Sequence, residues 1–195
     1  MSKMTEMQEE SPTGRWLWIG LLGGATIGFS LVFACATPFV ALVALAAVNM
    51  TGRDAFVVAG VVWLANQAVG YGILGYPQTF DSYAWGAAIG VAVLLALLAA
   101  RTIAQRAEGG LVLVTGIAFV AAFAVYELAL FAASFVLSSG PEAFSWSIVS
   151  YILQVNALGL AALVVLQLLA STFGLVKRPS RLIASNPGGN GNRRS

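Results

Sequence analysis

Five long apolar runs, separated by short polar or turn segments, limit what this chain can fold into. The runs cover 16–50, 55–74, 83–100, 111–137 and 144–176. A membrane-spanning helix needs about 20 predominantly apolar residues, so each run is long enough for a pass. Only 9% of the residues are charged, whereas a water-soluble domain carries about 25%. We therefore predict an all-α, polytopic membrane helix bundle.

The first run contains a proline that divides it. Residues 16–50 are too many for one ordinary pass, and Pro38 lacks an amide donor and disfavours helix at the residue before it. A break at Pro38 gives a full pass followed by a short segment, and six segments in all. One alternative is a single kinked first helix and five passes. In another, the short segment is a re-entrant half-helix, which has to be buried by protein.

The distribution of basic residues favours six segments. In that arrangement all ten Lys and Arg residues lie on one side of the membrane, and the opposite loops carry only Asp81 and Glu142. Because cytoplasmic loops are enriched in Lys and Arg, we expect both termini in the cytoplasm. The five-pass alternative places the N-terminus outside. The Ala-, Leu- and Gly-rich composition with more Arg than Lys suits a bacterial chain, so we expect the bacterial inner membrane.

The chain ends are polar and flank one transmembrane domain. We expect a polar tail over 1–15, the helical domain over 16–176, and a basic, Gly/Asn-rich disordered tail over 177–195. The basic tail is expected to touch anionic lipid or, alternatively, to dock on a partner. The long apolar stretch after residue 15 favours a retained membrane anchor over a cleaved signal peptide.

The residue inventory excludes several kinds of chemistry. The chain has no histidine and a single cysteine, Cys35, so it can form neither an internal disulfide nor a His-ligated metal site. It contains no phosphate-binding loop and no nucleophile motif. We expect no enzyme activity, no cofactor, no metal and no nucleic-acid partner. Cys35 is read as inert packing; alternatively, at an outer turn, it could ligate a soft metal.

A patterned face on the 55–74 run predicts a ligand pocket. Trp63, Asn66, Gln67 and Tyr71 recur at helical spacing and so share one side of a helix. Buried amides need hydrogen-bond partners, and Trp and Tyr supply flat apolar walls with a polar edge. The alternative is that these amides only join neighbouring helices.

Two further polar residues lie at similar predicted depth. Glu127 sits in an apolar run that has no basic residue, where a carboxylate disfavours insertion by roughly 3 kcal/mol. It is therefore expected to be neutral or to face a wet cavity, unless it merely bonds to a neighbouring helix. Gln154 shares a stripe with Ser147 and Ser150, and Asn156 lies roughly opposite. We include Glu127 and Gln154 with the pocket residues.

Glycines spaced by four predict close helix packing. Gly20, Gly24 and Gly28 form one such ladder, and Gly86 and Gly90 form a second. Small residues at this spacing let another backbone approach closely. The pattern leaves open whether the partner helix belongs to the same chain or to another copy.

If these polar faces converge, they form an outward-facing polar and aromatic cavity. The sequence then favours a small-solute transport or solute-binding membrane component, whose partners are the lipid bilayer and a small molecule. The alternative is a non-catalytic accessory or assembly subunit that pairs with other membrane subunits or with itself. A membrane enzyme is disfavoured, because acid–base chemistry usually needs a second group beside Glu127.

Overall fold

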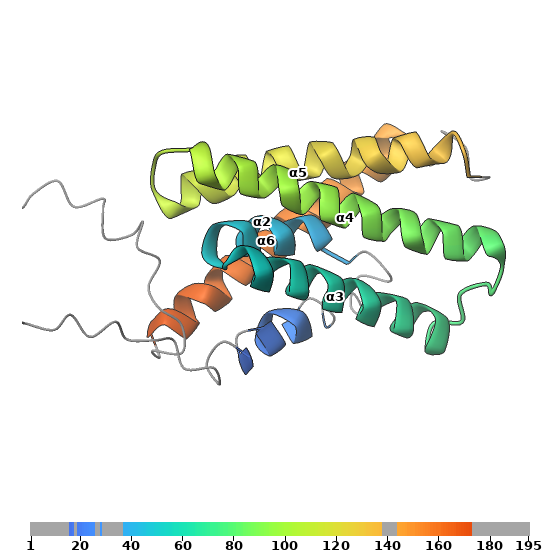
Figure 1. The fold of residues 1–195 in the computed structure, drawn as a ribbon, viewed down its shortest axis with the longest axis horizontal. Coiled ribbons are helices and arrows are strands. Elements are labelled where there is room, and N and C mark those ends of the chain that lie inside the picture. The colour runs from blue at the N-terminus through green and yellow to red at the C-terminus, as the bar shows by residue number, and fades with distance from the viewer. Residues whose placement is uncertain (1–15, 18, 26–27, 29–36, 138–143, 173–195) are drawn as a thin grey trace, which may run out of the picture.

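Helices make up the described part of the chain, and no strand occurs in it (Figure 1). A computed structural model describes residues 16–17, 19–25, 28, 37–137 and 144–172. The helices are α2 (Phe39–Asn49), α3 (Gly52–Gly72), α4 (Phe80–Arg106), α5 (Leu111–Ser134) and α6 (Trp146–Thr172), preceded by helical residues between 16 and 28. The prediction of an all-α membrane bundle with six segments is confirmed.

The outer surface of the bundle is apolar. Among the described helices, four are long and apolar enough to cross a membrane, namely α3, α4, α5 and α6. Large hydrophobic side chains such as Val91, Leu98 and Val120 are exposed on their outer faces. A contiguous apolar exterior is unfavourable in water and favourable in lipid. The chain is therefore an integral membrane protein.

The short helix α2 occupies the centre of the bundle and contacts α3, α4, α5 and α6 (Figure 1). Every residue from Phe39 to Ala47 is at most 8% exposed. Its 11 residues extend about 16 Å at 1.5 Å per residue, half of the ~30 Å hydrocarbon core. α2 is therefore too short to cross the membrane by itself, and Pro38 is its N-cap residue, as expected from the predicted break.

Local signals explain where the long helices begin. The side chain of Thr51 accepts a hydrogen bond from the Asp54 amide at the start of α3, and Thr79 accepts one from the Ser82 amide at the start of α4. These caps satisfy amides that have no partner within the helix. Between α3 and α4, Gly75 has a φ of 68°, a left-handed conformation that glycine adopts without strain.

Several sequence predictions fall on residues that the structure does not describe. They are the polar tail over 1–15, the basic tail over 177–195 and the role of Cys35. The orientation of the termini stays a prediction from the positive-inside rule.

Candidate functional site

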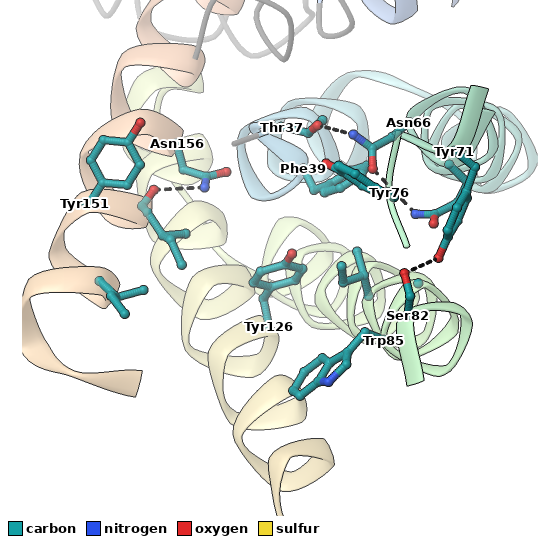
Figure 2. Close-up of a pocket in the computed structure, with 15 residues that line it drawn as sticks. Thr37, Phe39, Asn66, Tyr71, Tyr76, Ser82, Trp85, Tyr126, Tyr151 and Asn156 are labelled. Atoms are coloured by element: carbon teal, nitrogen blue, oxygen red, sulfur yellow. Dashed lines mark hydrogen bonds between the residues drawn. The ribbon is translucent and has the colours of Figure 1, made fainter. Parts of the chain in front are cut away.

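A cavity of about 450 Å³ lies beside the N-terminal end of α2 (Figure 2). Five helices and the loop between α3 and α4 contribute to it. The lining residues are Thr37, Phe39, Asn66, Gln67, Tyr71, Tyr76, Ser82, Trp85, Gly86, Ile89, Tyr126, Ile148, Tyr151, Ile152 and Asn156. Its volume is within the range of about 300–1,000 Å³ typical of small-molecule pockets.

The cavity lies at one end of the bundle. It draws on the C-terminal part of α3 and the N-terminal part of α4. Arg53 and Arg106 lie at the opposite ends of the same two helices. The cavity is therefore at the end of the bundle away from these arginines, which the positive-inside rule predicts to be the outward end.

Asn156 of α6 closes the cavity at the start of α2. Its Oδ1 accepts hydrogen bonds from the backbone amides of Val40, at 3.0 Å, and Ala41, at 3.3 Å. Its Nδ2 donates to the carbonyl oxygen of Ile152 at 3.0 Å. The first amides of a helix have no partner within it, and lipid offers none. Asn156 is 2% exposed, and it supplies this cap from another helix.

The amides of α3 form a chain that reaches the same place. Asn66 donates from Nδ2 to Oγ1 of Thr37 at 2.6 Å, which joins α3 to the residue preceding Pro38. Gln67 Nε2 donates to Oδ1 of Asn66 over a long distance of 3.5 Å. This chain of polar groups forms the side of the cavity that α3 provides (Figure 2).

Aromatic side chains cover the cavity beside the loop between α3 and α4. The amide of Tyr76 donates to the carbonyl oxygen of Gly70 at 3.0 Å, so the loop folds back onto α3. The Tyr76 ring lies edge-on to Tyr71, with centroids 5.8 Å apart, and Tyr71 stacks on Tyr83 at 4.7 Å. The Tyr71 hydroxyl pairs with that of Ser82 at 3.1 Å. A Cβ at Gly70 would lie 2.5 Å from the Tyr76 ring, so a larger residue there would have to displace the ring.

Tyr126 contributes a hydroxyl that has no hydrogen-bond partner among the described residues. The residue is 8% exposed. In Figure 2 the ring leaves α5 with its oxygen directed toward the middle of the lining side chains. Buried tyrosine hydroxyls usually have a partner. This hydroxyl is therefore available to a bound molecule.

The predicted pocket residues divide between the lining and the surrounding structure. Asn66, Gln67 and Tyr71 line the cavity, as the shared face of the 55–74 run predicts. Trp63 lies outside the lining. Its Nε1 donates a hydrogen bond to the carbonyl oxygen of Gly86 at 2.9 Å, which links α3 to α4.

Glu127 and Gln154 are also placed outside the lining. Glu127 is half-buried, and neither carboxyl oxygen has a hydrogen-bond partner among the described residues. Gln154 is exposed on the outer face of α6. On each of these helices the lining position belongs to a residue one or two places away, Tyr126 or Asn156.

The two glycine ladders have different surroundings. A Cβ at Gly86 would lie 2.6 Å from Gln67 Oε1, and one at Gly90 would lie 2.7 Å from the Trp63 ring, so this ladder is where α3 meets α4. Gly20, Gly24 and Gly28 have no described atom within 4 Å of the Cβ position. Within the described part of the chain, no helix packs on that ladder.

Sequence reasoning did not select several lining residues, among them Thr37, Tyr76, Ser82, Trp85, Tyr126, Tyr151 and Asn156. For Asn156 a signal was present, since an asparagine within an apolar helix needs a buried partner. For Tyr76 and Ser82 the contact depends on the fold of the loop between α3 and α4, which helical spacing does not describe.

Comparison of the chain with protein-family models, with curated proteins and with solved structures finds no match. The class of the protein therefore follows from its own geometry. It is an integral membrane protein built from apolar helices around a buried half-helix. A polar and aromatic cavity lies at the N-terminal end of that half-helix.

Proposed function

We propose that this chain is a non-catalytic, small-solute-binding or transport component of a bacterial inner membrane. The observation that carries the proposal is the cavity of about 450 Å³ beside α2, lined by hydroxyl, amide and aromatic side chains from five helices. Pockets that bind small molecules combine apolar walls with a few convergent polar groups. The cavity is at the outward end under the positive-inside rule, which suits uptake or sensing of an external solute.

A buried helix end beside the cavity supports the same role. In transporters, irregular backbone at membrane depth occurs where it lines a binding cavity, because elsewhere its polar groups would be unsatisfied. Here α2 begins beside the cavity and ends at Asn49, near the arginine end of the bundle.

The proposal is tested by filling the cavity. Ile89 on α4 lines it, so Ile89→Trp would occupy its space. Leu95 on the same helix is 42% exposed on the outer face, so Leu95→Trp is the matched control. The purified full-length protein in nanodiscs is screened by thermal unfolding against vitamins, small organic acids and metal ions, since a ligand that binds the native state stabilises it.

We expect at least one probe to raise the unfolding temperature of wild type and of Leu95→Trp, and not of Ile89→Trp. Glu127→Gln is expected to respond as wild type does, because Glu127 is outside the lining. The proposal is wrong if no probe shifts any of the proteins, or if Ile89→Trp responds as strongly as wild type.

A second candidate is an accessory or assembly subunit of a larger membrane complex. It is favoured by Gly20, Gly24 and Gly28, which have no described atom within 4 Å of their Cβ positions. Such a ladder permits close approach of a helix from another chain. Native co-purification separates the two: a stable stoichiometric partner supports the accessory role, and a monodisperse protein that binds a solute supports the first.

A further inference from the structure

We infer that the solute this cavity accepts is an uncharged, flat, hydrogen-bonding molecule, such as a heteroaromatic amide, and that the Tyr126 hydroxyl contacts it. The inference rests on the proposed function, because it names the class of solute for the same cavity. Four observations support it. The lining has no charged side chain, the first amides of α2 are already hydrogen-bonded, many lining residues are aromatic, and some lining polar groups have no described partner.

No charged side chain lines the cavity among the residues that the structure describes. The closest acidic residues in sequence to lining positions are Glu127, next to Tyr126, and Asp81, next to Ser82, and neither belongs to the lining. A charged solute that leaves water for a low-dielectric site needs a counter-charge there. The cavity offers only neutral groups, so an ionised solute is disfavoured.

An anion would find no free amides at the start of α2. Helix N-termini bind anions through unpaired backbone N–H groups. Here the Phe39 amide donates to the carbonyl oxygen of Thr37 at 2.8 Å, and the amides of Val40 and Ala41 donate to Asn156. With these donors already satisfied, a carboxylate or phosphate gains nothing at this helix end.

The lining is also a poor site for a metal ion. No group of three His, Cys, Asp or Glu side chains that could hold a metal occurs in the described residues. Transition metals prefer imidazole and thiolate ligands, and magnesium and calcium are usually held by carboxylates. The lining supplies amide and hydroxyl oxygens only as its side-chain ligands.

Six of the fifteen lining residues are aromatic, which favours a flat molecule. They are Phe39, Tyr71, Tyr76, Trp85, Tyr126 and Tyr151. Aromatic rings pack against one another in stacked or edge-to-face arrangements, which add to the stabilisation from buried area. A planar ring system can use these walls more fully than a branched aliphatic solute.

Polar groups in the lining that retain hydrogen-bonding capacity include the Tyr126 hydroxyl and Gln67 Oε1. The Tyr126 hydroxyl has no described partner, and Gln67 Oε1 accepts no hydrogen bond from a described residue. They lie on α5 and α3, two different helices around the cavity. A neutral amide both donates and accepts, so it can use a hydroxyl and a carbonyl oxygen together.

The test compares aromatic acids with their primary amides, which have nearly the same shape and differ in charge. The probes are nicotinate and nicotinamide, indole-3-acetate and indole-3-acetamide, with tryptamine as the cation. Binding to the full-length protein in nanodiscs is measured by calorimetric titration at neutral pH. We expect the affinity for each amide to be at least about ten-fold higher than the affinity for the matching acid. We expect the affinity for tryptamine to be no higher than that for the acids.

Tyr126→Phe tests the named contact, because it removes the hydroxyl and keeps the ring that packs in the core. We expect it to lower the affinity for the amides about ten-fold. Tyr83→Phe is the control, because Tyr83 stacks on Tyr71 without lining the cavity. Unchanged amide binding in Tyr126→Phe would remove Tyr126 from the inference.

The outcomes separate this inference from the proposed function. If an acid or tryptamine binds as tightly as the amides and Ile89→Trp abolishes that binding, the solute class is wrong and the cavity still binds solutes. If a metal ion or an anion from the broader screen binds while the amides do not, the class is wrong in the same way. If no probe of any kind binds, both the proposed function and the inferred solute class are wrong.

Discussion

Asn156 satisfies the buried start of α2 and also lines the cavity, so one side chain connects stability with binding. Its Oδ1 accepts from two backbone amides that lipid could not satisfy. Asn156→Leu removes the acceptor and leaves both amides unpaired. We expect the free energy of unfolding to fall by about 1–3 kcal/mol, the usual penalty for an unsatisfied buried polar group.

Unfolding in mixed detergent and SDS micelles measures this effect. Gln154→Leu on the same helix is the control, because Gln154 is exposed and an apolar residue there faces lipid. We expect that variant to be as stable as wild type or more so. Equal destabilisation of the two variants would show that Asn156 has no special part in holding α2.

At the residue scale, the sequence identified the α3 contribution to the cavity better than those of α5 and α6. Asn66, Gln67 and Tyr71 reinforce one another on one helix face, so their direction could be inferred together. Glu127 was selected because a membrane carboxylate is costly. Neighbouring residues on a helix point about 100° apart, so only one of Tyr126 and Glu127 is expected to face the cavity. The free-energy cost of inserting a carboxylate does not show which of the two it is.

At the scale of elements, the contact between α6 and α2 depends on a glycine. A Cβ at Gly159 would lie 2.6 Å from Cβ of Pro38, closer than real Cβ atoms approach. Gly159→Ala therefore forces α6 away from the start of α2 and weakens the hydrogen bonds of Asn156. We expect a loss of about 1–3 kcal/mol in unfolding free energy, typical of overpacking.

The same unfolding measurement applies to Gly116→Ala on α5, where no described atom lies within 4 Å of the Cβ position. That variant should be neutral or slightly stabilised, since alanine is the better helix former. If Gly159→Ala is as stable as wild type, α6 does not need to approach α2 this closely.

The elements themselves were largely predictable, because membrane helices are defined by length and hydrophobicity. The long runs correspond to α3, α4, α5 and α6, and Pro38 correctly marked the start of a separate short helix. The central position of α2 was not predictable. Its apolar sequence suits burial in lipid and burial in protein equally well, and only the contacts with four other helices distinguish them.

At the scale of the whole molecule, the distribution of basic residues predicts which end of the bundle faces outward. Single cysteines are introduced into a Cys35→Ser background at Gln78, in the loop between α3 and α4, and at Glu108, in the loop between α4 and α5. Both positions are exposed. We expect an impermeant maleimide to label Gln78→Cys in intact cells and Glu108→Cys only in inside-out vesicles.

Each variant is labelled both in intact cells and in inside-out vesicles. Because each cysteine should react from one side only, labelling in one preparation and not in the other is the internal control. Labelling of Glu108→Cys in intact cells would reverse the orientation and place the cavity at the cytoplasmic end. The cavity would then serve export or cytoplasmic sensing, with the same lining residues.

The buried position of α2 also constrains the order in which the molecule can be assembled. Translation produces α2 before α3, α4, α5 and α6, yet those four helices surround it. The acceptor for its first amides belongs to α6, the last described helix to be made. The central helix is therefore made before the residue that completes its hydrogen bonds. A ribosome-bound chain that stops before α6 has no acceptor from Asn156 for the Val40 and Ala41 amides.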